Sequence, residues 1–413
     1  MLANKLFERL IKVGDLTIID AKGRSSHYKA SDSPKVTIRI TDPHMHWKVM
    51  LAPQLAVGEA YMDGKLVIEE GTLFDFIDIG VQNLRLAYDD RVLRWLSQIR
   101  SFLARFADYN PIPRAKQRVA HHYDLDGRLF SLFLDSDQQY SCAYFADPAD
   151  DLETAQRRKK LHLAAKLSLQ PGQKVLDIGS GWGGLGLTLA EAANVSVTGI
   201  TLSEEQHKVS NDRAQSQGVT DRVSFHLRDY RNETGCYDRI VSVGMLEHVG
   251  RHHYRAFFSK IRDLLAEDGV AVIHSIGRFD QPGPVNAWMR KYIFPGSYIP
   301  TISEITGPIE NCNLLITDIE ILRLHYAETL LAWRKNFYRN LDKVREIYDE
   351  RFCRMWDFYL TACELGFRRK ELMVFQIQLA KSMEALPITR DYIHEFEAAH
   401  DAGWQSRQRM RIS

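Results

Sequence analysis

The stretch Lys174-Val-Leu-Asp-Ile-Gly-Ser-Gly-Trp-Gly-Gly184 decides the fold. Its first half contains the apolar residues Val175, Leu176 and Ile178, which predict a buried strand at 174–178. Glycines follow at once, and residues 185–193 then carry the pattern of a helix. A strand that enters a helix through glycines lets the backbone approach a bulky ligand without side-chain clashes. The sequence therefore predicts a ligand at this turn, where the start of the helix offers unpaired N–H groups.

The chain beyond this turn continues to alternate between strand and helix patterns. Strands are predicted at 195–200, 222–227, 237–243 and 269–275, helices near 204–217 and 252–266, and two further strands near 314–322 and 372–379. Such alternation predicts an α/β fold, a parallel sheet with helices on both faces. Residues 152–168 are predicted to form a helix with the basic residues 157–160 on its exposed side, and residues 327–366 to form one long amphipathic helix.

Residues 1–106 carry a different pattern, which predicts a small α+β domain without a catalytic motif. Its expected elements are strands at 16–19 and 35–40 and helices at 55–61 and 72–84. An amphipathic helix at 2–12 is open to two interpretations, contact with a membrane or docking on its own domain. Prolines then mark a linker at 107–120, and residues 121–413 are predicted to form the catalytic domain.

The composition of the 413 residues excludes several classes of protein. The net charge is +1, which gives no electrostatic argument for nucleic-acid binding. The five cysteines are widely spaced, which favours free thiols in a reducing compartment over disulfides. His44 and His46 lack a third ligand at metal spacing, so no metal site is expected. No apolar run is long enough to span a bilayer, and we expect a soluble or peripheral protein.

The second predicted strand argues against NAD as the ligand. A dinucleotide site needs an acidic residue about 20 positions after the glycines to hold the ribose. Thr201 stands at that place. Gln206, Glu204 and Glu205 are the nearby side chains that could meet ribose hydroxyls instead.

Polar residues also follow the later strands. Asp229 and Tyr230 offer an acceptor and a ring for a base, although a helix cap and a surface aromatic explain them equally well. Glu247 and His274 follow the fourth and fifth strands of the repeating region. Ligands bind at the carboxyl ends of such strands, so these two ionisable residues are expected to face one pocket.

Six motifs in order carry a resemblance to a known family. They are Gln139-Tyr-Ser-Cys-Ala-Tyr-Phe145, the glycine stretch at 175–184, Gly199-Ile-Thr-Leu-Ser-Glu-Glu-Gln206, Met245-Leu-Glu-His-Val-Gly250, Tyr292-Ile-Phe-Pro-Gly296 and His325-Tyr-Ala-Glu-Thr-Leu330. Together they cover essentially the whole chain, which resembles the bacterial cyclopropane-fatty-acyl-phospholipid synthases. One departure is Ser180, where the family usually has cysteine.

The resemblance implies a fold and an activity. The fold would be a class I methyltransferase with a mostly parallel, Rossmann-like sheet of seven strands. The activity would be transfer of a methylene group from S-adenosylmethionine to the cis double bond of an unsaturated acyl chain of a membrane phospholipid, which forms a cyclopropane ring. Bicarbonate would be bound in the site.

The resemblance also assigns site residues. The cofactor would contact Tyr140, Ser141, Asp177, Gly179, Gly181, Gly183, Thr201, Gln206, Asp229 and Tyr230. Bicarbonate would be held by Cys142, Glu247, His274, Tyr326 and the backbone of Ile276, and Cys363 matches a cysteine that the family marks as active. For Cys363, a small buried residue on a helix is the competing interpretation.

The chemistry fits these residue types. An isolated alkene is a poor nucleophile, so close alignment with the electrophilic methyl group matters most. Transfer leaves a carbocation, and a proton must then leave the new methyl group for the ring to close. A weakly nucleophilic base such as bicarbonate removes that proton without being alkylated.

Two alternatives stay open at this stage. A lipid C-methyltransferase would use the same cation but form a methyl branch or a methylene group, and a non-catalytic paralogue would only bind lipid. The expected partner is a phospholipid bilayer rather than nucleic acid, with a homodimer possible. Basic stretches at 157–160, 368–370 and 407–411 suggest peripheral binding at the inner face of the cytoplasmic membrane, although solvated surface faces explain them equally well.

Overall fold

The computed structural model describes residues 11–87 and 127–412, which form two compact units. The larger unit contains residues 127–281, 296–329 and 373–412, and the smaller unit contains residues 11–87, 282–295 and 330–372. The predicted linker at 107–120 lies outside the described residues, as does nearly all of the predicted helix at 2–12.

The larger unit is built on a sheet of seven strands in the order β10-β11-β9-β8-β5-β6-β7. The strands are β5 (Lys174–Ile178), β6 (Ser196–Thr201), β7 (Val223–Leu227), β8 (Tyr237–Val243), β9 (Leu265–Arg278), β10 (Leu315–Leu322) and β11 (Leu372–Ala380). The pairs from β7 to β9 are parallel, and β10 is antiparallel to β11. The predicted α/β class with a mostly parallel sheet is confirmed, and both β5 and β8 have their predicted bounds.

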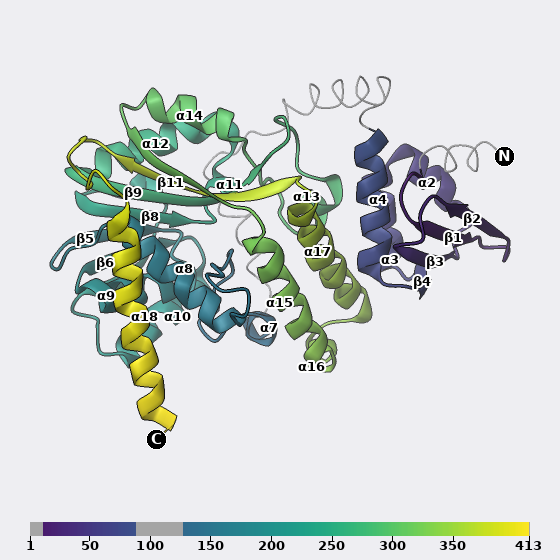
Figure 1. Ribbon diagram of the computed structural model, residues 1–413, viewed down its shortest axis with the longest axis horizontal. Coiled ribbons are helices and arrows are strands. Elements are labelled where there is room, and N and C mark those ends of the chain that lie inside the picture. Colours follow the sequence, from purple (N-terminus) through teal and green to yellow (C-terminus); the bar gives the residue numbers. More distant parts are fainter. Residues whose placement is uncertain (1–10, 88–126, 413) are drawn as a thin grey trace. The chain divides into compact units, whose positions relative to one another are not determined.

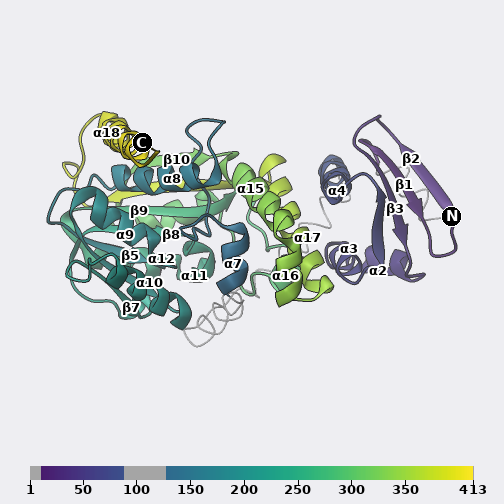
Figure 2. The same ribbon diagram turned by 90° about the horizontal axis from the view of Figure 1, so that it is seen from below.

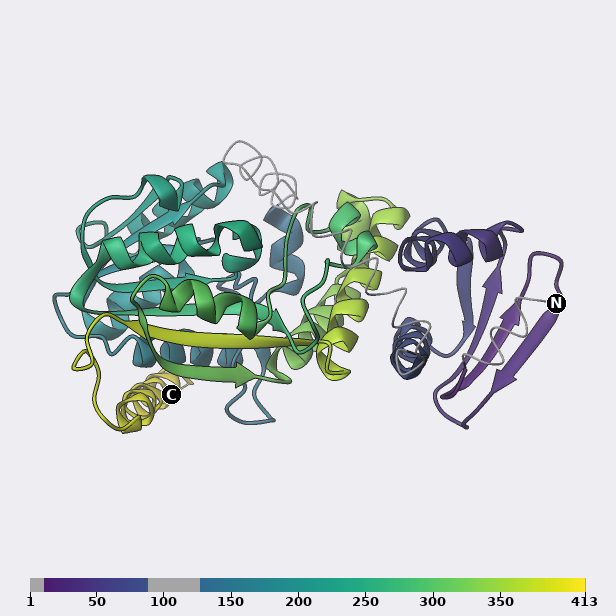
Figure 3. The same ribbon diagram turned by 90° about the horizontal axis from the view of Figure 1, so that it is seen from above.

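Helices cover both faces of this sheet (Figure 1). One face carries α8 (Leu152–Lys166), α9 (Gly184–Ala193), α10 (Glu204–Ser216) and α18 (Asp391–Ile412), and the other carries α12 (Tyr254–Leu264) and α14 (Ile302–Glu310). Figure 2 shows α8 beside α18, and Figure 3 shows α12 beside α14.

The strands alternate their side chains between these two layers. Val175 and Val241 pack with α9 in one core, whereas Leu176 and Ile240 pack with α12 in the other. All of these side chains are buried, as the pattern of apolar runs in a parallel sheet requires. The two cores fix the strands in register, so the carboxyl ends of β5 and β8 lie side by side.

The smaller unit has a sheet of four strands in the order β2-β1-β3-β4. Its elements are β1 (Asp15–Ile19), β2 (Ser25–Lys29), β3 (Lys35–Ile40), β4 (Leu66–Glu70), α2 (Met45–Leu51), α3 (Pro53–Met62), α4 (Leu73–Ala87), α13 (Ala287–Tyr292), α16 (Leu341–Ile347) and α17 (Glu350–Arg368). The sequence did not predict β2, β4 or α2. Both strands have at most one fully buried side chain, so they lack the alternation that marks a strand.

The prediction of one helix over 327–366 is wrong, because three helices occupy this stretch. They are α15 (His325–Arg339), α16 and α17. Asp349 ends the continuity before α17, since its carboxylate accepts a hydrogen bond from the N–H of Phe352 at 2.7 Å. Such an N-cap starts a new helix even within a continuous amphipathic pattern.

The predicted exposure of the basic residues 157–160 on α8 is also wrong. Lys159 is fully buried and Lys160 nearly so. Arg157 pairs with Asp401 of α18 at 2.5 Å, and Arg158 pairs with Asp150 at the same distance. Helix α8 is covered by α18 and by the loop before it, and this tertiary packing leaves no exposed basic face there.

A buried histidine ties α8 to β10 and α18. His162 lies 2.7 Å from Glu320 and 2.6 Å from Glu397, and Lys166 pairs with Glu320 at 2.5 Å. Burial acts to lower the pKa of His162, but the hydrogen bonds to both carboxylates raise it above its ordinary value. Although burial opposes the shift, His162 and Lys166 lower the pKa of Glu320 to about 2.

This cluster predicts a pH dependence of stability. A raised pKa means that the contribution of His162 is complete below about pH 6.5 and is lost as the pH rises through the raised value. The change His162→Gln should destabilise the protein by about 3 kcal/mol near pH 6. Urea unfolding of both proteins from about pH 6 to about pH 9 should show this gap narrowing as the pH rises. A gap that stays constant over that range would contradict the assignment.

Candidate active site

The turn after β5 has the conformation that its glycines allow. Gly179, Gly181 and Gly183 all have positive φ, at 82°, 54° and 83°, and Gly183 precedes the first turn of α9. A Cβ on Gly183 would meet the Phe225 ring at 2.9 Å, whereas a Cβ on Gly181 would meet nothing within 4 Å. Gly183 is therefore needed for packing, and Gly181 leaves open space beside the backbone.

Buried polar atoms without a partner gather along this turn. Among the described residues, Asp177 Oδ2, Ser180 Oγ and Trp182 Nε1 find no hydrogen-bond partner. Burial raises the pKa of Asp177 to about 7, against the opposing effect of Lys159. Buried polar groups are costly unless they are paired, so this row of donors and acceptors fits a polar ligand in the turn.

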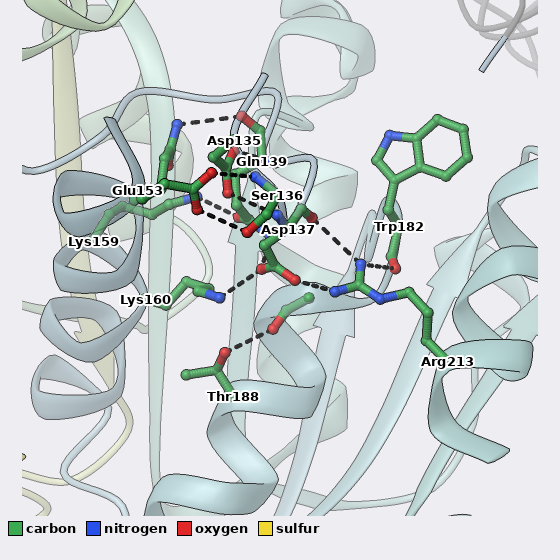
Figure 4. Close-up of polar contacts among 12 residues, drawn as sticks. Asp135, Ser136, Asp137, Gln139, Glu153, Lys159, Lys160, Trp182, Thr188 and Arg213 are labelled. Carbon is green, nitrogen blue, oxygen red and sulfur yellow. Dashed lines mark hydrogen bonds and ion pairs between the residues drawn. The ribbon is translucent and has the colours of Figure 1, made fainter. Parts of the chain in front are cut away.

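The turn is held in place by a cluster of charged residues (Figure 4). Asp137 pairs with Lys160 of α8 at 2.5 Å and with Arg213 of α10. Arg213 also donates to the carbonyl oxygen of Trp182 at 2.9 Å. The Asp137 carboxylate occupies the place of a Cβ on Gly184, which explains the last glycine of the motif.

The residues after β6 and β7 lie near the same strand ends. Thr201 Oγ1 donates to Gln206 Oε1 at 2.9 Å, and both side chains are buried. Asp229 caps a short helix by accepting from the N–H of Arg231 at 2.9 Å, and it also pairs with that guanidinium. Tyr230 is buried edge-on against Phe257. For Asp229 the helix-cap interpretation is thus realised, and a role in cofactor binding stays a prediction.

Glu247 is held at the junction of β8 and β9. It lies on the short helix α11 (Leu246–Val249), and its Oε1 accepts a hydrogen bond from the N–H of Ile276 at 2.6 Å. Its Oε2 is buried and has no partner among the described residues. Burial raises the pKa of Glu247 to about 7, although the hydrogen bond from Ile276 opposes this. The Ile276 N–H already donates to Glu247. The backbone carbonyl of Ile276 is therefore the group that could contact an anion, and because a carbonyl is an acceptor, the anion would have to carry a proton.

His274 lies on β9, two residues before Ile276. Its backbone carbonyl accepts from the N–H of Gly244, and its register partner is Val243 at the end of β8. Gln376 of β11 donates from Nε2 to His274 Nδ1 at 3.2 Å. Burial holds the pKa of His274 well below its ordinary value, so the ring is neutral. With Nδ1 in contact with Gln376, Nε2 is the ring nitrogen that remains for a ligand.

The stretch after α7 (Gly127–Phe133) meets the start of α15. The N–H of Ala143 donates to Thr329 Oγ1 at 3.0 Å, and the N–H of Phe145 donates to His325 Nδ1 at 3.0 Å. These bonds join the segment of Cys142 to the first turn of α15, which carries Tyr326. Both Cys142 and Tyr326 are buried. Burial raises the pKa of Cys142, which keeps it a neutral thiol.

Tyr140 and Cys363 complete the predicted set. The ring of Tyr140 packs edge-on against Phe130 of α7. Cys363 lies on α17 in the smaller unit, and burial raises its pKa to about 12. A neutral thiol is a weak nucleophile, so a chemical role for Cys363 stays a prediction.

Comparison with known proteins identifies the family. A family model described as "Mycolic acid cyclopropane synthetase" matches residues 112–377. Cyclopropane-fatty-acyl-phospholipid synthase of Escherichia coli K12 is 36% identical over 354 residues, which cover 85% of this chain and 90% of that protein. The chain belongs to the mycolic acid cyclopropane synthetase family. The resemblance seen in the sequence is thereby confirmed.

One further relative matches nearly the whole chain, and two solved structures match its larger part. Tuberculostearic acid methyltransferase of Mycobacterium tuberculosis is 34% identical over 92% of this chain and 91% of its own. The structure of a cyclopropane synthase from M. tuberculosis has a TM-score of 0.62 and 32% identity, covering 66% of this chain and 100% of its own. A mycolic acid cyclopropane synthase complexed with SAH and CTAB has the same TM-score and 31% identity, covering 66% and 99%. A second family, described only as a domain of unknown function, matches residues 3–87.

Membership in the synthetase family establishes the general activity. The chain is an S-adenosylmethionine-dependent methyltransferase of lipid biosynthesis. The row of unpaired polar atoms at Asp177, Ser180 and Trp182 fits a methyl donor of this kind. When bound, the donor supplies an electrophilic methyl group.

The sequence missed several buried polar residues at this site. Gln376 is fully buried and contacts His274, and Gln156 and Lys159 lie buried on α8. The only signal for Gln376 is its alternation with Gln378 on an otherwise apolar strand. Two glutamines on one face of a buried strand indicate that this face meets polar groups rather than an apolar layer.

Gly181 provides a test of the donor site. The change Gly181→Ala costs about 1 kcal/mol of stability because of its positive φ, but the new methyl group meets no protein atom. We expect the Kd for S-adenosylhomocysteine, measured by calorimetry, to rise at least about tenfold.

Gly172 is the matched control for this change. It has a φ of 83° and equally open space, but it lies before β5 rather than after it. Gly172→Ala should therefore leave the Kd unchanged. Equal effects of the two changes, or none for Gly181→Ala, would place the donor elsewhere.

Proposed function

We propose that this synthetase transfers a methylene group from S-adenosylmethionine to the cis double bond of an unsaturated acyl chain of a membrane phospholipid. The product is a cyclopropane ring, with S-adenosylhomocysteine and one proton released. The observation that carries the proposal is the burial of two ionisable side chains, Glu247 just after β8 and His274 on β9 opposite the end of β8. Glu247 Oε2 has no partner among the described residues, and the neutral ring of His274 contacts Gln376 through Nδ1, which leaves Nε2 for a ligand.

These residues suit the control of one proton. The methyl group adds to the alkene, and the bond from sulfur to that methyl breaks as the new carbon–carbon bond forms. The resulting cation loses a proton from the new methyl group, and the freed electron pair closes the ring. Bound bicarbonate would supply a weakly nucleophilic acceptor for this proton. Glu247, His274 and Tyr326 would hold it, together with Cys142 and the backbone of Ile276.

The protein around the site supports a cationic step. Cys142 is kept as a neutral thiol by burial, so it is a poor trap for a carbocation. The ring of His274 is neutral, so it can donate a hydrogen bond to the anion without adding a positive charge beside the carbocation. The aromatic faces of Tyr140 and Tyr326 can stabilise a cation without bonding to it. A buried site also keeps water from quenching the cation.

A second candidate is formation of a methyl branch or a methylene group from the same cation. It is favoured by the similarity to tuberculostearic acid methyltransferase, which extends over 92% of this chain. The two functions differ only in the fate of the cation. Loss of a proton from the new methyl group with ring closure gives the cyclopropane. Loss of a proton from a neighbouring carbon of the chain keeps the methyl group as a branch on an alkene, and a hydride shift followed by loss of a proton from the methyl group gives a methylene group.

Access to lipid is part of the proposal. Within the described residues, no helix is long and apolar enough to span a membrane. Of the basic stretches, 157–160 is not exposed, and Arg368 and Arg369 pair with Glu364 and Asp78. The smaller unit exposes Trp47, Leu84 and Leu86, which are side chains suited to the membrane interface. We propose that residues 1–106 contact lipid or a second copy, at the inner face of the cytoplasmic membrane.

Mass spectrometry of the lipid product tests the reaction. Vesicles of an unsaturated phospholipid are incubated with enzyme and S-adenosylmethionine carrying a trideuterated methyl group. Ring closure predicts a product that retains two of the three deuterium atoms and resists ozonolysis. Retention of all three deuterium atoms would indicate a methyl branch, and cleavage by ozone of a dideuterated product would indicate a methylene group.

Substitution of the buried pair tests the site. Glu247→Gln and His274→Ala should each lower the rate of ring formation at least about 100-fold, because the proton acceptor is no longer held. The affinity for S-adenosylhomocysteine, measured by calorimetry, should stay within about threefold of wild type.

A glutamate outside the site gives the matched control. Glu310→Gln changes an exposed side chain at the end of α14 and should leave the rate unchanged. Near-normal turnover in Glu247→Gln or His274→Ala would refute the assigned roles.

A further inference from the structure

Helix α8 turns two buried polar side chains toward the site. Gln156 and Lys159 lie three residues apart, on the same face of the helix, and both are fully buried. Lysine is almost never fully buried unless its charge is compensated. The packing of these two residues therefore calls for an explanation in terms of a partner.

Both side chains bind one short segment, Gln139 to Ser141 (Figure 4 shows Lys159 and Gln139). Lys159 Nζ donates to Gln139 Oε1 at 2.6 Å and to Ser141 Oγ at 2.9 Å. Gln156 Nε2 donates to the carbonyl oxygen of Gln139 at 3.2 Å and to that of Ser141 at 2.9 Å. The segment leads directly into Cys142, so α8 sets the position of this wall of the site.

The charge of Lys159 is not neutralised by these contacts. In the part of the chain that the structure describes, no carboxylate oxygen lies within ion-pair distance of its ammonium group. Its neighbours on α8 differ, because Lys160 pairs with Asp137 and Lys166 with Glu320, each at 2.5 Å. Lys159 donates two hydrogen bonds to neutral acceptors, although an ammonium group has three protons.

The ammonium of Lys159 acts on the residues of the site. Burial lowers its own pKa to about 8, so it stays mostly charged near neutral pH. Burial dominates the pKa values of Cys142, Asp177 and His274, and in each case the charge of Lys159 favours the form with more negative charge. The electrostatic field of Lys159 thus acts both on Asp177 of β5, beside the proposed site of the methyl donor, and on Cys142 and His274, which are assigned to bicarbonate.

We propose that Lys159 is a positioning residue that supplies the compensating positive charge for a small monovalent anion held beside Cys142 and His274. The anion would contact an ammonium group that no carboxylate of the described residues reaches directly, although Asp135 and Asp137 act on it from a greater distance. Gln156 holds the segment from Gln139 to Ser141 in position beside it. The inference rests on the proposed function, in which that anion is bicarbonate.

The test measures the dependence of ring formation on bicarbonate in buffer freed of carbon dioxide. Lys159→Gln keeps a polar group near Ser141 but removes the charge, and it should raise the half-saturating bicarbonate concentration at least about tenfold. The Kd for S-adenosylhomocysteine should stay within about threefold. Lys159→Arg, which keeps the charge, should restore most of the affinity for bicarbonate.

Two further variants separate charge from structure. Gln156→Glu leaves Lys159 in place but offers it a carboxylate, so it should also raise the half-saturating bicarbonate concentration, even if Lys159→Gln fails to fold. Lys343→Gln is the matched control, because it makes the same change at an exposed lysine on α16, and its half-saturating concentration should match that of wild type.

The possible failures are distinguishable. A wild-type rate that does not depend on bicarbonate would refute the proposed proton acceptor, and with it this inference. A bicarbonate-dependent wild type with unchanged half-saturation in Lys159→Gln or Gln156→Glu would overturn the role of Lys159 alone. A parallel loss of affinity for S-adenosylhomocysteine and bicarbonate would assign Lys159 a merely structural role.

Discussion

A single buried carboxylate carries the arrangement of the site. One oxygen of Glu247 accepts from the Ile276 N–H at 2.6 Å, which locks α11 to the far part of β9. The other oxygen is buried without a partner among the described residues. A carboxylate in this state is unfavourable unless a ligand completes its hydrogen bonds. The fold of the larger unit tolerates this cost because the two packed cores hold the strand ends in place around it.

The parallel sheet was predictable because its signals are local. The apolar runs of β5 and β8 are bounded by glycines and polar residues, and their predicted bounds match the structure. The break before α17 was not predicted, since a single capping residue, Asp349, interrupts a continuous amphipathic pattern. Likewise, β2 was not predicted, because only Tyr28 among its residues is buried and the strand therefore lacks an alternating apolar pattern.

The site was predictable where motifs place residues at strand ends. Glu247 follows β8 as the sequence indicated, whereas His274, expected after the fifth strand, lies within β9 opposite Val243 at the end of β8. The supporting residues were not predictable. From the sequence, Lys159 is expected to belong to an exposed basic stretch. In the structure α18 and the loop around Gln139 pack on α8, and Lys159 is buried against that loop. Local sequence patterns do not show which helix faces are buried by segments far away in the chain.

A crystal structure of the enzyme with S-adenosylhomocysteine and bicarbonate tests the central claim most directly. The account predicts the sulfur of the cofactor product at the end of β5, with a planar anion beside it that contacts His274 Nε2 and Glu247. A sulfur bound away from these strand ends, or a site in which both side chains turn away from the sulfur and hold no anion, would contradict it.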